Sequence, residues 1–343
     1  MTGTSGSAGL PGACPAGPGG RASGRLGVGV VGAGRVGAVL ASALRATGHA
    51  VVGASGVSQA SRERIELLLP GVPRLEVAEV VRRAELVLLA VPDDALADLV
   101  AGLAATGAWQ AGQLLVHTSG RYGTAVLAPA SAAGAIGLAV HPAMTFTGTS
   151  LDLARLPGSS MAVTAPAVVL PVGQALVIEM GAEPVVVPEH ARPAYHAALA
   201  HASNHVVTVL AQSRQLLADA GVEEATGLLL PLVQAAVDNA VRMGDVALTG
   251  PVARGDEGTV RAHLAELAAG DARRDPDEAV LPTYRALARA TLARARHQRR
   301  LAPAAVDALA ATLAEDRPDG TADPPADDRP AGGPDDRPHG QAP

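Results

Sequence analysis

The sequence contains no lysine, because all 27 of its basic residues are arginine. A chain without lysine cannot form a lysine Schiff base, anchor pyridoxal phosphate or supply the lysine of a P-loop. Its single cysteine, Cys14, excludes an internal disulfide and argues against thiol catalysis and cysteine–zinc sites. One Trp, three Tyr and one Phe provide few platforms for stacking nucleic-acid bases, and the net charge is -6. We therefore expect no nucleic-acid partner.

Long apolar runs are missing as well. No uninterrupted apolar run reaches the roughly eighteen residues of a membrane-spanning helix, and the nearest stretch, 165–180, is broken by Pro171, Gly173 and other residues. We therefore predict a water-soluble chain with no membrane partner. Residues 1–24 are rich in Gly, Ala, Ser and Pro and lack the apolar segment of a secretory signal. They predict a disordered leader and a cytoplasmic protein.

Two folded domains are expected between the tails. The chain has 343 residues, of which 48% are hydrophobic and 17% charged, so it exceeds most single domains and can bury a large core. Residues 25–188 alternate short apolar runs with helical stretches, which predicts an α/β fold with a doubly wound parallel sheet. Residues 189–314 have an almost entirely helical pattern, which predicts an all-helical second domain. The apolar runs that predict strands are Leu26–Val31, Ala50–Ala54, Leu86–Val91, Leu114–His117, Ile136–Val140, Met161–Thr164 and Pro184–Val187.

Residues 315–343 shift in composition to Asp, Pro and Gly. They hold eight carboxylates against three arginines, so most of the net charge of the chain lies here. Such a composition predicts a disordered acidic tail, whose simplest role is to keep the chain soluble and whose alternative role is to dock a partner.

A glycine-rich turn follows the first apolar run and leads directly into the helical stretch Ala38–Thr47. In this context the Gly-x-Gly-x-x-Gly pattern is typical of dinucleotide binding. The first glycine permits the tight turn, the second lets the backbone approach the pyrophosphate, and the third allows the helix to pack on the strand. The helix N-terminus then presents its unpaired N–H groups to the anion. We expect the cofactor to contact Gly32, Ala33, Gly34, Arg35, Val36 and Gly37.

The end of the second apolar run distinguishes NAD from NADP. An acidic residue about 20 positions after the glycines would bind the ribose 2′-hydroxyl of NAD, but no acid occurs here before Glu63. Ser55, Ser58, Arg62 and Arg64 instead offer hydroxyls and guanidiniums suited to a 2′-phosphate. NADP is therefore favoured over NAD. The alternative is that Arg62 and its neighbour Arg64 are merely solvated residues of the following helix.

The third apolar run ends in Val91 and Pro92, followed by Asp93 and Asp94. A proline just inside a helix start suits the turn that usually borders the cofactor ribose. We expect Val91 and Pro92 to contact the cofactor and the two aspartates to cap the helix.

Polar residues also end the next two predicted strands. Thr118, Ser119 and Gly120 follow one strand, and His141 follows the other. Ligands bind at the carboxyl ends of strands in a doubly wound sheet, so these four residues are expected to line the site. His141 could equally orient a loop.

In the helical half, His201, Asn204 and His205 share one helix face through their i, i+3, i+4 spacing. Two histidines four residues apart can form a metal pair, but the residues between them lack the glutamate of a zincin, so no metal is expected. A histidine on a helix can also be a packed or capping residue.

With these motifs the chain resembles Rossmann-like oxidoreductases that carry a helical C-terminal domain of unknown function. These are relatives of ketopantoate reductase, pyrroline-5-carboxylate reductase and the β-hydroxyacid dehydrogenases. The resemblance covers about residues 25–300 and is carried by His117–Gly120, His141–Phe146 and Thr249–Val260. It implies an NAD(P)-dependent oxidoreductase that forms a homodimer through its helical domain, and the apolar residues of 228–241 are compatible with such an interface.

The resemblance also implies catalytic roles. In the β-hydroxyacid dehydrogenases a Ser-Gly-Gly turn holds the substrate, and a Lys-x-x-Asn helix supplies an acid/base lysine and an orienting asparagine. Ser119 and the pair His201 and Asn204 resemble these elements, with histidine standing where that family has lysine. Histidine can donate and accept protons near neutral pH. Arg254 is the candidate to bind a substrate carboxylate, and Asp256 or Thr249 to bind a hydroxyl.

The leading interpretation is an NADP-dependent reductase of a small 2-oxo acid, with ketopantoate as the first substrate to consider. A second interpretation is the reduction of a cyclic imine such as pyrroline-5-carboxylate, since a protonated imine needs no strong general acid. A third is a sensor or scaffold that binds NADP without catalysing a reaction. Resemblance of fold cannot choose among these substrates.

Overall fold

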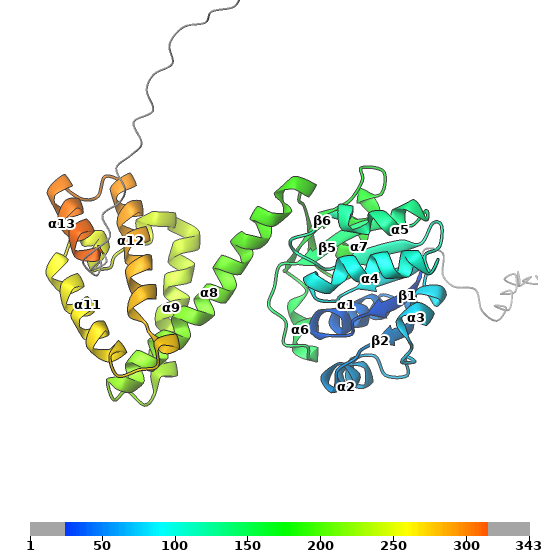
Figure 1. Cartoon of the computed structure of the whole chain (residues 1–343), viewed down its shortest axis with the longest axis horizontal. Coiled ribbons are helices and arrows are strands. Elements are labelled where there is room, and N and C mark those ends of the chain that lie inside the picture. Colours follow the sequence, from blue (N-terminus) through cyan, green and yellow to red (C-terminus); the bar gives the residue numbers. More distant parts are fainter. Residues whose placement is uncertain (1–24, 315–343) are drawn as a thin grey trace, which may run out of the picture. The chain divides into compact units, whose positions relative to one another are not determined.

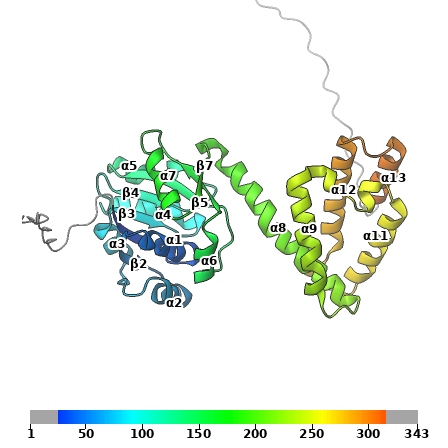
Figure 2. The same cartoon turned by 180° about the vertical axis from the view of Figure 1, so that it is seen from behind.

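The computed structural model describes residues 25–314, and the predicted leader and acidic tail lie outside the described residues. The chain divides into two compact units, one that ends at Val209 and one that begins at Leu210 (Figures 1 and 2). The division falls within helix α8 (Arg192–Asp219), which contributes residues to both units. The sequence places the domain boundary at residue 188, just before this helix starts.

A seven-stranded sheet with the order β2-β1-β3-β4-β5-β6-β7 forms the centre of the first unit. Each predicted apolar run overlaps a strand, and the α/β fold class is confirmed. The strands are β1 (Gly27–Val31), β2 (Ala50–Ser55), β3 (Leu86–Leu89), β4 (Leu114–His117), β5 (Ile136–Pro142), β6 (Ser160–Thr164) and β7 (Glu183–Val186).

Helices cover both faces of this sheet, which explains why its strands are continuous apolar runs. Successive side chains of a strand point to opposite faces, so Val30 and Leu88 belong to one buried cluster, whereas Val31 and Leu89 belong to the other. One face packs against α1 (Arg35–Ala46), α2 (Gln59–Leu68), α6 (Ser150–Arg155) and α7 (Leu170–Glu179). The other packs against α3 (Val77–Arg83), α4 (Asp93–Ala105), η1 (Thr124–Leu127) and α5 (Ala128–Ala132).

The sheet is mostly parallel, as expected, but β6 runs antiparallel to β5, and β7 is parallel to β6. Residues 143–159, which include the short helix α6, connect the two strands. The chain re-enters the sheet beside the end of β5, where Met161 pairs with Pro142.

The second unit consists of helices. Its core contains Val252, Val260, Leu264, Ala288, Leu292, Leu309 and Leu313. These residues come from α10 (Pro251–Arg254), α11 (Glu257–Asp271), α12 (Leu281–His297) and α13 (Pro303–Leu313). By contrast, α9 (Ala225–Met243) buries only Ala225 of its 19 residues. Within residues 25–314, no helix combines the length and the apolar character needed to cross a membrane.

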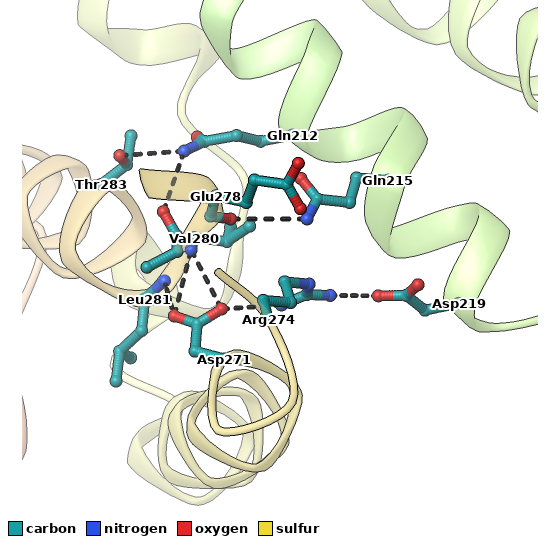
Figure 3. Close-up of polar contacts among 10 residues, drawn as sticks. Gln212, Gln215, Asp219, Asp271, Arg274, Glu278, Val280, Leu281 and Thr283 are labelled. Atoms are coloured by element: carbon teal, nitrogen blue, oxygen red, sulfur yellow. Dashed lines mark hydrogen bonds and ion pairs between the residues drawn. The ribbon is translucent and has the colours of Figure 1, made fainter. Parts of the chain in front are cut away.

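The carboxylate of Asp271 joins α11 to the start of α12. It accepts hydrogen bonds from the backbone N–H of Val280 at 3.0 Å and of Leu281 at 2.8 Å, and it pairs with Arg274 at 2.7 Å (Figure 3). Arg274 also forms an ion pair with Asp219 near the end of α8. One carboxylate therefore caps α12 and holds the arginine that reaches α8.

We expect Asp271→Ala to lower the free energy of unfolding of the second unit by about 2 kcal/mol, because two backbone amides and Arg274 lose their acceptor. Urea denaturation followed by circular dichroism measures the change. Asp277→Ala is the control, since the Asp277 carboxylate makes no hydrogen bond or ion pair within residues 25–314. Equal stability of the two variants would contradict the assigned role.

Candidate functional site

A cavity of about 900 Å³ opens in the first unit where β1, β3 and β4 end. The glycine turn after β1 forms one side, the end of β2 another, and the turn after β4 a third. The structure thus gathers motifs that are far apart in the sequence. The predicted site residues that line this cavity are Gly32, Gly34, Arg35, Val36, Ser55, Ser58, Val91, Pro92, Thr118, Ser119, Gly120 and His141.

The glycine turn has the geometry of an anion site. Gly32 has a φ of 88°, and a Cβ on it would lie 2.6 Å from the Ala90 carbonyl oxygen. A Cβ on Gly37 would lie 2.3 Å from the Gly32 carbonyl oxygen, so the helix packs closely on the turn. A Cβ on Gly34 would instead point into open space, and no side chain caps the start of α1. The first-turn amides of α1 are therefore open to a phosphate, whereas Ala33 is fully buried beneath the turn.

Serines surround the end of β2. Ser55 Oγ accepts a hydrogen bond from the backbone N–H of Gly32 at 3.3 Å. Ser58 caps α2 by accepting from the N–H of Ser61 at 3.1 Å, and both Ser58 and Ser61 line the cavity. Arg62 does not line it, because its guanidinium donates back to the Val57 carbonyl oxygen at 2.9 Å and to Gln59. The cation available to a ligand at this end comes from elsewhere.

Arg35 supplies that cation. Its exposed side chain lines the cavity at the start of α1. The side chains of Arg35 and Arg64 both lie close to Gly148. A Cβ on this glycine would be 3.0 Å from Arg35 Cγ and 2.6 Å from Arg64 Nε. Neither arginine is in an ion pair with an acid in the part of the chain that the structure describes. Arg35 thus brings an unneutralised charge to the cavity that Ser58 and Ser61 also line.

His117 fixes the turn after β4. Its Nδ1 accepts from the backbone N–H of Ser119 at 3.2 Å, so Nε2 carries the proton and donates to the Gly123 carbonyl oxygen at 2.8 Å. Burial lowers the pKa of this imidazole to about 4, and the positive charge of Arg192 acts in the same direction. His117 is therefore neutral at pH 7 and holds Ser119. It does not line the cavity.

His141 lies beside two residues of α8 that the sequence analysis did not assign. Its Nδ1 is 2.9 Å from the Tyr195 hydroxyl, and its ring meets the ring of His196 edge to face at 5.8 Å. Burial lowers the pKa of His141 to about 4, and the positive charges of His196 and Arg192 contribute. A Cβ on Gly120 would lie 2.5 Å from His196 Cδ2 and 3.0 Å from His141 Nε2. Only glycine at position 120 lets both rings approach the turn.

A second cavity of about 280 Å³ adjoins the first, since His141 and His196 line both. Asn204 lines this second cavity together with Ser203 and Leu199. The i, i+3, i+7 spacing of His196, Leu199 and Ser203 places them on one face of α8, and this periodicity is the signal that could have identified His196.

His201 and His205 are exposed, and their Nδ1 atoms are 2.7 Å apart. Neither histidine lines the two cavities. The prediction of His201 as a catalytic residue therefore has no support from the cavity geometry.

Arg254 and Asp256 belong to the second unit and are not among the residues that line either cavity. Arg254 donates to the Thr249 carbonyl oxygen. Asp256 caps α11 by accepting from the N–H of Thr259 at 3.1 Å and from its hydroxyl at 2.7 Å, and these bonds lower the pKa of Asp256. Both residues thus have local structural partners.

Comparisons with known proteins agree with this architecture. Residues 13–142 match the family described as Rossmann-like domain, and residues 159–291 match the domain of unknown function DUF2520. No curated protein matches the sequence.

Solved structures share the fold. A Bacteroides fragilis protein described as a candidate NADP oxidoreductase is 21% identical, with a TM-score of 0.66 over 78% of this chain and 98% of that one. A Thermotoga maritima protein is 22% identical, with a TM-score of 0.56 over 79% and 99% of the two chains. A variant imine reductase from Myxococcus stipitatus, in complex with NAD⁺, is 19% identical, with a TM-score of 0.52 over 78% and 94%.

The neutral state of His117 predicts a dependence of stability on pH. The pKa of His117 is about 4 in the folded chain, against an ordinary value of 6.5. As the pH falls through this window, the unfolded chain binds a proton that the folded chain does not, so stability decreases as the pH falls. The loss reaches about 3 kcal/mol for a shift of this size.

Urea denaturation at about pH 7 and pH 5 measures this dependence in the wild type and in His117→Gln. We expect a smaller loss of stability in the variant. His297→Gln, at an exposed helix end, is the control and should behave as the wild type does. An unchanged pH dependence in His117→Gln would rule out His117 as its source.

Proposed function

We propose that this chain, whose residues 13–142 match a Rossmann-like domain and whose residues 159–291 match a DUF2520 domain, is an NADP-dependent oxidoreductase that reduces the carbonyl group of a small 2-oxo acid. Ketopantoate is the first substrate to test. One observation carries the proposal: a single cavity holds the glycine turn at one end and Ser119, His141 and His196 at the other. A cofactor bound along the turn would direct its reactive ring toward polar groups that can handle a proton.

The residues present fit NADP. The open space above Gly34 and the uncapped start of α1 suit the pyrophosphate. The hydroxyls of Ser58 and Ser61 and the guanidinium of Arg35 would hold the 2′-phosphate, a role that the sequence pattern gives to Arg62. β2 ends without a carboxylate that could bind a free 2′-hydroxyl. The description of the Bacteroides fragilis protein supports the same cofactor.

When bound, the reduced nicotinamide supplies a hydride to the substrate carbon. Ser119 Oγ accepts from the N–H of Tyr122, which leaves its own hydroxyl proton free to donate to the substrate oxygen. With Tyr195 donating to Nδ1, neutral His141 carries its proton on Nε2, toward Gly120, and can donate to the same oxygen. These donors stabilise the negative charge that develops on that oxygen.

His196 is the residue that we propose gives the proton to the reduced oxygen, because it lines both cavities. This role replaces the one predicted for His201. Asn204 lines the adjoining cavity and would bind the distal part of the substrate.

A cyclic imine is the second candidate substrate, favoured by the structural likeness to an imine reductase. A protonated imine needs no proton at the reduced atom, so loss of His196 would then leave most of the turnover. Binding of NADP without any turnover would instead support the sensor or scaffold interpretation.

NADPH oxidation at 340 nm tests the proposed function. The assay uses ketopantoate, then other 2-oxo acids and cyclic imines, and repeats each with NADH. We expect turnover of a 2-oxo acid with preference for NADPH, and a decrease of kcat by about 10²-fold in His196→Gln. His201→Gln is the matched comparison and should retain most activity. The reverse order of the two variants would return the proton-donor role to His201.

We also propose that the chain forms a homodimer. Along α9, Leu228 and Leu232 are exposed by 52 and 61% on one face, and Val237 and Val241 are exposed by 52 and 83% on the opposite face, so the helix presents apolar side chains on both sides. So many exposed apolar side chains on one helix mark an interaction surface. A second copy is the simplest occupant, because most soluble oligomers are symmetric assemblies of identical chains.

Light scattering coupled to size-exclusion chromatography measures this association. We expect a dimer for the wild type and a monomer for the double variant Leu232→Glu/Val241→Glu, which places one charge on each of these two apolar faces. Val168→Glu is the control, since Val168 is 90% exposed but lies in the first unit, away from α9 in sequence. A monomeric wild type would overturn the proposal.

A further inference from the structure

Arg192, the first residue of α8, is completely buried. Its guanidinium makes four hydrogen bonds, and all four acceptors are uncharged. Nε donates to Thr164 Oγ1 at 2.8 Å, and Nη1 donates to the Ser119 carbonyl oxygen at 3.2 Å. Nη2 donates to the carbonyl oxygens of Ala139 at 2.8 Å and Ala162 at 3.1 Å.

No carboxylate lies within ion-pair distance of this guanidinium in residues 25–314. The acid that acts on it electrostatically is Glu189. Glu189 is exposed, and its carboxylate is engaged by the backbone N–H groups of Thr124 and Ala125 at 2.8 and 3.1 Å. Water therefore screens the carboxylate of Glu189, so that this acid offsets little of the buried charge of Arg192. Uncompensated buried charges are costly, so their retention at a site calls for a functional reason.

The buried charge lies directly behind the end of the cavity where we place the substrate. Nη1 contacts the backbone of Ser119, and the guanidinium carbon is 5.9 Å from the centre of the Tyr195 ring, which in turn contacts His141. The neighbouring imidazoles of His117 and His141 are neutral at pH 7. Among the residues that line the cavity, Asp93 is the one carboxylate. Arg192 therefore adds positive charge behind this end of the cavity, where it acts on His117 and His141, although it does not line the cavity itself.

We propose that Arg192 is a positioning residue that selects substrates bearing a carboxylate, through the positive potential it creates behind Ser119 and His141. The inference rests on the proposed function, because it assumes that the substrate binds beside these two residues. It favours a 2-oxo acid over a protonated cyclic imine that lacks an acid group, since the buried charge attracts the former and repels the latter.

Ligand binding tests this role without requiring turnover. The probes are oxamate, an anionic mimic of a 2-oxo acid, and its uncharged methyl ester, each titrated by calorimetry into the protein saturated with NADP⁺. We expect the wild type to bind oxamate at least tenfold more tightly than the ester. Arg192→Met should abolish this preference, and Arg192→Lys should retain most of it because the charge is kept. A folded Arg192→Met variant that still prefers oxamate would overturn the proposal.

Thr164→Val is the matched control. It removes one hydrogen bond from Arg192 but leaves the charge in place, so the preference for oxamate should persist. If neither Arg192 variant folds, the wild type decides: equal binding of acid and ester overturns the proposal, and a preference for the acid that Thr164→Val retains supports it.

Titration of NADP⁺ alone distinguishes a failure of the proposed function from a failure of the proposed role of Arg192. Failure to bind NADP⁺ would contradict the proposed function. Normal binding of NADP⁺ with no discrimination between oxamate and ester would contradict only the role of Arg192.

Discussion

The site depends on one constraint: the buried guanidinium of Arg192 must donate hydrogen bonds to main-chain oxygens. The register of the sheet aligns His117 with Ala139 and Ala139 with Thr164, so three neighbouring strands present their polar groups at one level. Arg192 binds at this level and thereby starts α8 against the sheet. Tyr195 and His196, one turn further along α8, then reach the turn at Gly120. The antiparallel direction of β6 brings Thr164 to this point.

The chemistry of the site follows from desolvation. His117 and His141 lie among apolar strands with a buried cation nearby, so both remain uncharged at neutral pH. An uncharged imidazole can donate one hydrogen bond and accept another. His117 uses both to hold the Ser119 turn, whereas His141 shares one with Tyr195 and directs the other ring nitrogen toward Gly120. One imidazole is structural and the other is available to a ligand, although the sequence places both at strand ends.

Local patterns predicted most of the first unit. The glycine turn follows a strand and opens a helix, and this short-range geometry brings Gly32, Gly34 and Gly37 to their expected places. The direction of β6 could not be predicted in the same way, since it depends on how far the preceding connection travels. Similarly, the sequence pattern assigns the 2′-phosphate to Arg62 and does not indicate Arg35. The backbone carbonyl of Val57 holds Arg62, and this contact is visible only in three dimensions.

The face of α8 that meets the cavities was the hardest feature to predict. A pattern of i, i+3, i+4 makes His201, Asn204 and His205 neighbours, but it does not indicate which face of α8 meets the cavities. His196 and Asn204 line them, while His201 and His205 contact each other in the open.

Arg192 donates three of its four hydrogen bonds to carbonyl oxygens, which every amino acid carries. The side chains at 119, 139 and 162 can therefore change during evolution without removing an acceptor, provided that the backbone keeps its path. Selection acting on the arginine would preserve the shape of the site while the surrounding sequence drifts. Such a site is better recognised by the course of its main chain than by a sequence motif.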